Sequence, residues 1–313
     1  MSNKYHNPVL FQECLDGLQI KPGGTYIDVT FGGGGHSQGI LNQLTTGHLI
    51  AFDQDIDTEK NVQRVEASAD AQKSSFTFIE SNFRYLKKFL RLHGIKEADG
   101  ILADLGVSSH QFDEPSRGFT TRADGELDMR MDQSASRSAK EIVNDYEEKD
   151  LIHILSAYGE VKNARTLARE IVSYRMNQPV QTSEELKTIA LKNAPRGREL
   201  KYLAQVFQAI RIEVNDEMAA LKDFLTQTSE VLKEDGRLVV MSYHSLEDRL
   251  VKNFINKGNF KGTDEKDFYG NPIRDFDPVN RKPIVPTTAE IKENSRARSA
   301  KLRIGRKRGE SGK

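Results

Sequence analysis

Short apolar segments alternate with helical patterns in the first hundred residues. The apolar segments are rich in β-branched and aromatic residues and span Thr25–Thr30, His48–Phe52, Ser75–Ile79 and Gly100–Ala103. Between them, apolar residues recur every three or four positions, as in amphipathic helices. Strands joined by helices form parallel sheets through right-handed crossovers. The pattern therefore predicts an α/β fold with a parallel sheet.

The alternation stops after the fourth apolar segment, and the next strong strand pattern is Gly236–Tyr243. This interval is too long for one crossover and contains several helical patterns. We expect a helical insertion over residues 134–201, within a discontinuous domain formed by residues 1–133 and 202–313. Apolar positions from Tyr202 to Leu225 then predict one long amphipathic helix that returns to the sheet.

The carboxyl-terminal part contains weaker signals. Ser245 and Asp248 have the spacing of a capping box that opens a helix. Lys, Asp, Gly, Asn and Pro are dense over residues 256–286, which predicts an irregular segment. Ala300–Ile304 is expected to form the last strand.

Composition narrows the function classes. The 313 residues are 37% hydrophobic and 29% charged, with zero net charge, so bulk positive charge does not bind this chain to nucleic acid. The single cysteine, Cys14, lies among apolar residues at helical spacing, which indicates a core position in a reducing compartment. The sequence contains no run of about 18 apolar residues, so we expect no membrane span and a cytoplasmic location.

Two features at strand ends point to a nucleoside cofactor. Gly32–Gly35 would let backbone N–H groups approach a ligand, although the spacing G-x-G-x-x-G of dinucleotide-binding proteins is not met. Asp53 follows the second strand, where a carboxylate can accept both ribose hydroxyls. This combination suits S-adenosylmethionine as well as NAD. A simple turn and a helix cap would explain either feature alone.

Other polar residues also end strands. Asp104 ends the fourth strand, and His244 ends the fifth, where ligands of open α/β sheets bind. His244 is equally compatible with a structural role at a helix start. Its spacing to Asp248 would suit a metal, but no third ligand is close in sequence, so we assign no metal.

Basic residues cluster in two places. Residues 292–313 contain nine Lys or Arg against two acids, a balance of +7, which predicts a phosphate-binding patch. Residues 162–201 contain nine against four, a balance of +5, for which a solvated helix face is the simpler interpretation.

Several long motifs occur in the order found in one family. They are His6-Asn-Pro-Val-Leu10, Asp28-Val-Thr-Phe-Gly-Gly-Gly-Gly-His-Ser37, Asp104-Leu-Gly-Val-Ser-Ser109 with Gln111, Arg117-Gly-Phe119, Leu127-Asp-Met-Arg-Met-Asp132, Phe207-Gln-Ala-Ile-Arg-Ile-Glu-Val-Asn215, His244-Ser-Leu-Glu-Asp-Arg249 and Arg296-Ala-Arg-Ser-Ala-Lys-Leu302. Across nearly its whole length the chain resembles the ribosomal RNA small-subunit methyltransferase H family, also called MraW.

This resemblance implies an α/β, class I (Rossmann-like) S-adenosylmethionine-dependent methyltransferase sheet with a helical insertion domain. It implies N4-methylation of a cytidine in 16S rRNA of the small ribosomal subunit. It also implies cofactor contacts from seven residues: Gly34, Gly35, His36, Asp53, Phe83, Asp104 and Gln111.

Catalytic roles are less determined. Amino-group methyltransferases often carry Asp/Asn/Ser-Pro-Pro-aromatic after the fourth strand, whereas this chain has Asp104-Leu-Gly-Val107. We expect Asp104, Ser108 or Ser109, and His244 to line the rim where cytosine enters. An unstacked base needs a platform, for which Phe112, Arg117 and Phe119 are candidates.

Three function classes stay open on the residues alone: an rRNA methyltransferase, an NAD-dependent oxidoreductase, and a ribosome-assembly factor that binds S-adenosylmethionine without turnover. A methyltransferase acting on DNA, protein or a small molecule is a further alternative. Residues 134–201 would recognise RNA, form a homodimer surface or cover the pocket, and periodicity does not choose among these roles.

Overall fold

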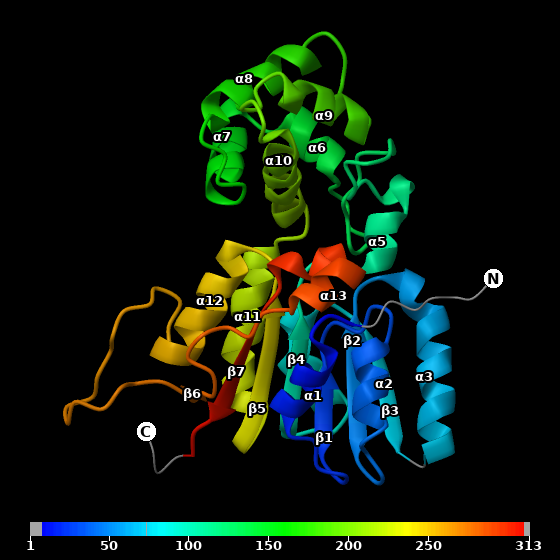
Figure 1. Ribbon diagram of the computed structural model, residues 1–313, viewed down its shortest axis with the longest axis vertical. Helices are drawn as coiled ribbons and strands as arrows, with labels where there is room; N and C mark the ends of the chain where they lie inside the picture. The colour runs from blue at the N-terminus through cyan, green and yellow to red at the C-terminus, as the bar shows by residue number, and fades with distance from the viewer. Residues whose placement is uncertain (1–7, 73, 310–313) are drawn as a thin grey trace. The chain divides into compact units, whose positions relative to one another are not determined.

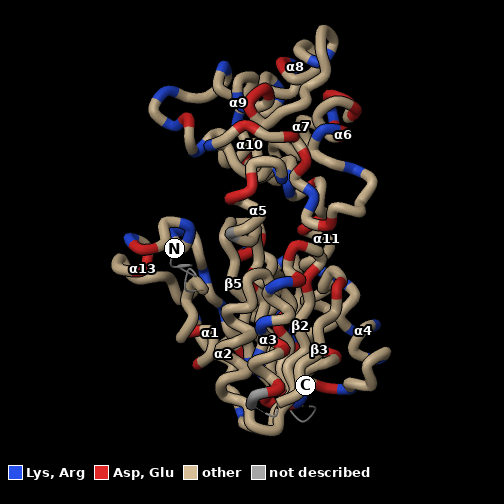
Figure 2. Tube along the Cα trace, turned by 90° about the vertical axis from the view of Figure 1, so that its right-hand side faces the viewer, with Lys and Arg blue, Asp and Glu red and all other residues tan. Residues whose placement is uncertain are grey.

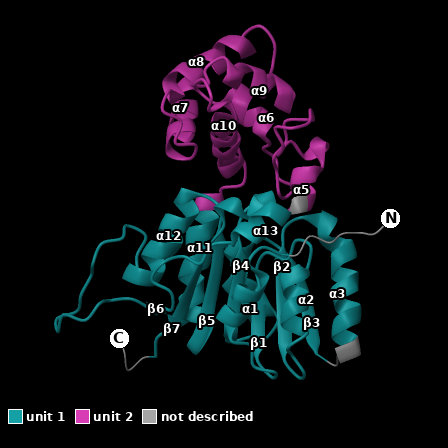
Figure 3. Cartoon of the chain, in the orientation of Figure 1, with its two compact units in different colours: residues 1–106, 219–313 teal, residues 107–218 magenta. Residues whose placement is uncertain are grey.

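The computed structural model describes residues 8–72 and 74–309, apart from the side chains of residues 71, 72 and 109. The chain forms two compact units. Unit 1 comprises residues 1–106 and 219–313, and unit 2 comprises residues 107–218 (Figure 3). His6 and Asn7 of the first family motif lie outside the described residues.

Unit 1 is built on a seven-stranded sheet with the order β3-β2-β1-β4-β5-β7-β6 (Figure 1). Its strands are β1 (Thr25–Asp28), β2 (His48–Asp53), β3 (Ser75–Glu80), β4 (Ala98–Asp104), β5 (Leu232–Ser242), β6 (Phe276–Pro278) and β7 (Lys301–Lys307). β1 to β5 pair in parallel, and β7 is antiparallel to both β5 and β6. This sheet confirms the expected α/β, Rossmann-like fold class.

Helices cover both faces of the sheet. One face packs against α1 (Phe11–Leu18), α2 (Gly35–Leu41) and α3 (Glu59–Gln72) through Leu15, Ile40 and Val65. The other packs against α4 (Leu86–Leu92), α11 (Glu217–Val231) and α12 (Ser245–Lys257) through Leu90, Phe224 and Val251. A sheet buried on both faces explains the nearly continuous apolar runs of its central strands. Cys14 is fully buried on α1, as predicted.

The strand register aligns three carboxylates at one edge. Asp28 ends β1 and lies opposite Ala51 of β2 and Leu102 of β4. Asp53 and Asp104 follow those partners by two residues and end their own strands. The carboxyl ends of three neighbouring strands therefore each carry an aspartate.

Unit 2 is helical and has its own core. It contains α5 (Ser109–Asp113), α6 (Ala139–Asp145), α7 (Glu148–Ala157), α8 (Ala164–Arg175), α9 (Ser183–Leu191) and α10 (Glu199–Val214). The unit is wider than the range 134–201 expected for the insertion. Phe119, Leu127 and Met131 from the preceding segment pack into the same core, as does Val206 of α10.

The long helix predicted from Tyr202 to Leu225 is wrong, because the chain breaks into α10 and α11. Asp216 has a φ of 48°, in the left-handed region that interrupts a helix. The side chain of Asn215 accepts a hydrogen bond from the Met131 N–H and donates one to the Met129 carbonyl, both at 2.8 Å. Apolar spacing continues through the break, so periodicity alone does not reveal it.

Smaller elements also differ from expectation. β5 begins earlier than Gly236, β7 extends to Lys307, and the short strand β6 lies within the segment predicted as irregular. The remaining described helices are α13 (Thr288–Glu293) and the 3-10 turns η1 (Ile56–Thr58), η2 (Phe83–Tyr85), η3 (Pro115–Arg117) and η4 (Ser295–Ser299). Within the described residues, every helix is too short or too polar to cross a membrane.

Candidate active site

The glycine run forms the loop between β1 and α2, and its members differ in what they require. Gly34 has a φ of 71°, and a Cβ there would lie 2.9 Å from Cζ of Phe31. A Cβ on Gly35 would lie 2.4 Å from Cγ of Pro8. A Cβ on Gly33 meets nothing within 4 Å. Gly34 and Gly35 therefore leave no room for a Cβ, whereas Gly33 borders open space.

Asp53 ties this loop to the end of β2. Its Oδ2 accepts a hydrogen bond from the Gly32 N–H at 2.7 Å, and its Oδ1 accepts one from the Asp55 N–H at 3.0 Å. Burial raises the pKa of Asp53 to about 6 against the effect of these hydrogen bonds. A carboxylate has about four acceptor positions, so two stay available for ligand hydroxyls.

Asp104 ends β4 and has few polar partners. Its Oδ1 accepts a hydrogen bond from the Tyr243 hydroxyl at 2.9 Å, and its backbone N–H donates to Thr30 Oγ1 at 2.6 Å. Burial raises its pKa to about 7, opposed by the Tyr243 hydroxyl and assisted by the charges of Asp28 and Glu247. Burial together with Asp104 raises the pKa of Tyr243 well above its usual value, so this hydroxyl stays a donor.

Asp28 is buried beneath the same strand ends. It accepts hydrogen bonds from Ser37 Oγ at 2.7 Å and from the Thr30 N–H at 3.2 Å. Burial raises its pKa to about 6, and these hydrogen bonds only partly offset that effect. Among the described residues, no Lys or Arg pairs with Asp28, Asp53 or Asp104. Three clustered carboxylates without a cationic partner favour a positively charged ligand.

His36 is the second residue of α2 and lies beside this cluster. Its Nδ1 lies 3.8 Å from Oδ2 of Asp104, and its ring stacks with that of Phe11 at 6.0 Å. Burial lowers its pKa to about 4, so the ring is neutral at pH 7 and does not neutralise Asp104. Its buried Nε2 has no hydrogen-bond partner within the described part of the chain, which leaves a polar group that a ligand can satisfy.

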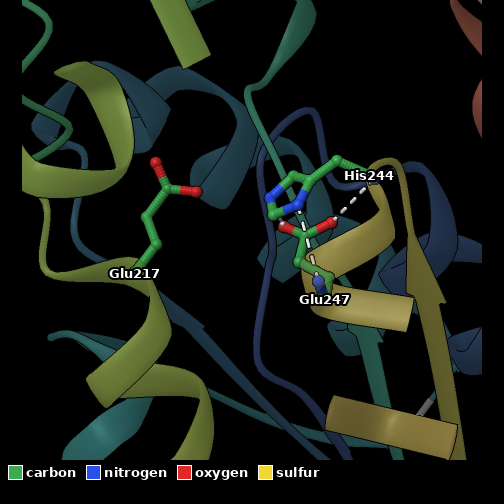
Figure 4. Close-up of side chains that lie close together, drawn as sticks. All are labelled: Glu217, His244 and Glu247. Atoms are coloured by element: carbon green, nitrogen blue, oxygen red, sulfur yellow. Dashed lines mark hydrogen bonds and ion pairs between the residues drawn. The ribbon is translucent and has the colours of Figure 1, made fainter. Parts of the chain in front are cut away.

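His244 is the N-cap of α12, and the predicted capping box of Ser245 and Asp248 is wrong by one residue. The Glu247 N–H donates to His244 Nδ1 at 3.4 Å, and Glu247 Oε2 accepts from the backbone N–H of His244 (Figure 4). The same Oε2 also accepts from the Tyr243 N–H. Nε2 of His244 lies 3.1 Å from Glu247 Oε1, without hydrogen-bond geometry. His244 therefore has the structural role considered from the sequence, and Glu247 fixes the end of β5.

Asp248 has a different role from capping. Its carboxylate accepts a hydrogen bond from Arg303 Nε at 2.6 Å and pairs with Lys301 Nζ at 3.3 Å. Burial alone would raise the pKa of Asp248, but Arg303 and Lys301 together lower it. These contacts join α12 to β7.

The remaining predicted site residues lie on other elements. Phe83 in η2 is half-buried and packs edge-to-face on Phe224, with ring centroids 5.3 Å apart. In unit 2, Ser108 is the N-cap of α5. Its Oγ accepts from the Gln111 N–H at 3.2 Å, while Gln111 Oε1 accepts from the Ser108 N–H at 3.1 Å. The Ser109 side chain lies outside the described residues.

The proposed stacking platform is largely buried in unit 2. Arg117 is 5% exposed and donates to the carbonyl of Arg130 at 3.0 Å, and its guanidinium lies over the ring of Phe119, itself 6% exposed. Phe112 is half-buried against the helical core. Because they are buried, Arg117 and Phe119 offer little surface to a base. The sequence pattern did not show that these two side chains face inward.

The carboxyl-terminal basic patch is smaller than its sequence suggests. Several of its cations pair with carboxylates of unit 1: Lys301 and Arg303 with Asp248, Arg306 with Asp235 and Asp277, Lys307 with Asp275, and Arg308 with Asp277. Lys313 lies outside the described residues. Most of the described cations on β7 thus stabilise the sheet edge.

Sequence reasoning missed Asp28, Thr30 and Tyr243. Asp28 and Thr30 both stand within a motif quoted above, and Asp28 ends a strand as Asp53 and Asp104 do. That position was a usable signal for Asp28. The contact of Tyr243 with Asp104 joins residues 139 positions apart and needs the fold.

Comparison with known proteins agrees with the motifs. A model of the MraW methylase family matches residues 3–308. The ribosomal RNA small subunit methyltransferase H of Flavobacterium johnsoniae is 56% identical over 305 residues, covering 97% of this chain and 98% of the relative. That of Christiangramia forsetii is 55% identical over the same length, covering 97% and 98%. A solved rRNA methylase from Streptococcus thermophilus aligns over 95% of each chain at 10% identity, with a TM-score of 0.42. The chain therefore belongs to the MraW methylase family.

Proposed function

We propose that this chain is an S-adenosylmethionine-dependent methyltransferase that methylates N4 of a cytidine in 16S rRNA of the small ribosomal subunit. The observation that carries the proposal is the match of the whole chain to relatives named for small-subunit rRNA methylation. The site supports it, because three carboxylates and a glycine loop meet at the strand ends of unit 1.

The cofactor roles follow from the chemistry of the site. S-adenosylmethionine supplies an electrophilic methyl group on a positively charged sulfur, together with a ribose and an ammonium group. Asp53 would accept the ribose hydroxyls, and Gly34 and Gly35 would let the backbone approach closely. Asp104 would balance positive charge, and the unpartnered Nε2 of His36 would bond a polar cofactor group. Phe83 and Gln111 are proposed contacts from η2 and α5.

Catalysis by this chain rests on positioning and on one proton acceptor. The amino nitrogen of cytosine must be held in line with the methyl group, and it must lose a proton. Asp104 has a pKa near neutrality, so it is suited to accept that proton. Ser108 and His244 use their side chains as N-caps, and we propose that they hold the backbone of their loops in place.

The helical unit is the proposed substrate-recognition domain of this enzyme. It corresponds to the predicted insertion at residues 134–201, enlarged to the bounds of unit 2. The 16S rRNA within the small ribosomal subunit is the proposed partner. The homodimer and the cytoplasmic location stay predictions.

Measuring cofactor affinity and turnover separately tests these roles. We expect Asp53→Asn to weaken S-adenosylmethionine binding about 10- to 100-fold, since hydrogen bonds to a charged group contribute about 1.5–3 kcal/mol. Asp70→Asn, on the exposed face of α3, is the matched control and should bind normally. Turnover is measured on small ribosomal subunits from cells lacking this protein. Normal cofactor binding by Asp53→Asn would contradict the assignment.

The same assay separates an enzyme from an assembly factor. The proposed enzyme should transfer label from S-adenosylmethionine to RNA, and Asp104→Asn should lower turnover at saturating cofactor. Binding of S-adenosylmethionine without transfer to mature subunits or assembly intermediates would instead favour the non-catalytic assembly role.

A further inference from the structure

A basic, partly aromatic surface of unit 1 begins in η2, next to the proposed cofactor residue Phe83, and continues along α4. It runs from Arg84 through α4 to Lys96, and Figure 2 labels α4 and colours all Lys and Arg positions blue. Its five cations are Arg84, Lys87, Lys88, Arg91 and Lys96, and the same stretch contains no acid. We call these residues, with Tyr85, the α4 strip.

The cations of the α4 strip are not all neutralised. Arg84 pairs with Asp223 at 2.7 Å, and Lys87 pairs with Glu230. Lys88, Arg91 and Lys96 are exposed and form no ion pair with any carboxylate of the described chain. This contrasts with β7 and the residue after it, where Lys301, Arg303, Arg306, Lys307 and Arg308 are all paired with aspartates. The charge of the α4 strip is therefore available to a partner.

An open cavity of about 360 Å³ lies at the end of the α4 strip. Its lining includes three apolar residues, Leu90, Ile95 and Val231, and three cations, Lys87, Arg91 and Lys96. Glu230 also borders the cavity and is paired with Lys87. A cavity of this size holds a small planar group, and the lining cations place positive charge beside it.

An exposed aromatic ring stands at the other end of the α4 strip. Tyr85 is 49% exposed, and Arg84 and Lys88 each lie 6.0 Å from its ring centroid. Exposed aromatic rings flanked by cations are the stacking platforms of proteins that bind single-stranded RNA. The buried Arg117 and Phe119 cannot provide such a platform on the surface of unit 2.

We propose that the α4 strip is a second RNA-binding site, which holds single-stranded rRNA outside the methyl-transfer site. The cavity receives one unstacked base, Arg91 and Lys96 bind the neighbouring phosphates, and Tyr85 stacks on a second base. This inference rests on the proposed function for the identity of the RNA. Unpaired cations favour a polyanion over a protein partner, because protein interfaces are depleted of Lys.

Salt dependence of RNA binding tests the proposal directly. The triple variant Lys88→Gln, Arg91→Gln, Lys96→Gln removes three cations that form no ion pair in the described chain, so no carboxylate loses its partner. The control, Lys60→Gln, Lys222→Gln, Lys252→Gln, removes the same charge from exposed positions on α3, α11 and α12. Binding of the full chain to a fluorescent single-stranded RNA oligonucleotide is measured from 0.05 to 0.5 M salt.

If the three cations each contact a phosphate, the negative slope of log K against log salt should become shallower by about 2 in the triple variant. This corresponds to about 50-fold weaker binding at 0.15 M salt. The control variant should change the slope by less than about 1. Equal slopes for the two triple variants would overturn the proposal, because the charge would then act without a defined site.

The cavity is tested without changing charge. Ile95→Trp should fill it and weaken RNA binding while leaving the salt slope unchanged. Free cytidine monophosphate is the second probe. If this mononucleotide binds the cavity but oligonucleotide affinity does not depend on Ile95, the site is one for free nucleotides and the proposal is wrong.

Failure of this inference can be distinguished from failure of the proposed function. All variants should bind S-adenosylmethionine like the unmodified protein and show its unfolding midpoint. Loss of RNA binding only in the α4-strip variants supports the inference even if the methylated nucleoside is not the expected one. Normal RNA binding by these variants, with methylation intact, contradicts the inference and leaves the proposed function standing.

Discussion

Replacing Asp104 with Asn should stabilise the ligand-free protein while weakening its cofactor binding. In the folded chain Asp104 has a pKa of about 7, because burial disfavours its charge. The unfolded chain releases this proton near pH 4. The folded state thus binds the proton more tightly, so Asp104 lowers the stability of the protein as pH rises from about 4 to 7.

The size of this effect follows from the shift. A displacement of about three pKa units at about 1.4 kcal/mol each gives an upper value of about 4 kcal/mol at pH 8. The side chain is 25% exposed, so solvent reduces the cost. We therefore expect Asp104→Asn to gain about 1–4 kcal/mol in the free energy of unfolding at pH 8, and close to nothing at pH 4. Asn retains an oxygen that accepts the Tyr243 hydroxyl.

Urea unfolding at several pH values between 4 and 8 measures this gain. Asp99 at the opposite end of β4 provides a matched control. Burial alone would raise the pKa of Asp99, but Lys233, the Thr25 N–H and Lys21 together lower it. Asp99 therefore adds stability above pH 4, and Asp99→Asn should destabilise the protein at neutral pH and not in acid.

Cofactor binding should respond in the opposite direction. Ionised Asp104 favours a positively charged ligand, so affinity of the unmodified protein for S-adenosylmethionine should rise with pH through about 7. Calorimetric titration of Asp104→Asn should show weaker binding with a flatter pH dependence. A variant that is less stable than the original at pH 8, or whose stability gain is the same at every pH, would refute this reasoning.

Three further substitutions test other parts of the structure. Gly34→Ala places a Cβ at a φ of 71° beside Phe31 and should lower the free energy of unfolding in urea by about 1–2 kcal/mol. Gly33→Ala should lower it by less than about 1 kcal/mol, and equal losses would contradict the geometry of the loop. Ser108→Ala removes the N-cap of α5 and should cost about 1 kcal/mol by the same measurement, with no loss if the cap is unimportant. Arg303→Met leaves the partly buried Asp248 with only Lys301 as an ion-pair partner and should cost about 1–3 kcal/mol, much of it recovered in the double variant Arg303→Met, Asp248→Leu; absence of recovery would argue against the ion pair.

The sequence was most informative where a single local pattern decides the structure. Strands β1 to β4 were predicted because each contains a short apolar run, and the site edge followed from Asp53 and Asp104, which end two of these strands. The break between α10 and α11 was not predictable from periodicity, since it depends on Asn215 bonding to Met129 and Met131 about 85 positions earlier.

Side-chain roles were harder to predict for the same reason. Ser245 and Asp248 have the spacing of a capping box, yet the strand ends one residue earlier and the cap is formed by His244 and Glu247. Asp248 instead accepts a hydrogen bond from Arg303, 55 positions away. Likewise, the charge of residues 292–313 suggested a free patch because the aspartates that pair with it are distant in sequence. Long-range partners decide these roles, and composition does not contain them.

The identity of the methylated nucleoside decides whether this chain is a cytidine N4-methyltransferase. Purified protein is incubated with isotope-labelled S-adenosylmethionine and small ribosomal subunits from cells that lack it, and the RNA is digested and analysed by mass spectrometry. We expect label in N4-methylated cytidine from 16S rRNA, at a level reduced by Asp53→Asn. Label in another nucleoside, or none despite tight cofactor binding to mature and immature subunits, would contradict it.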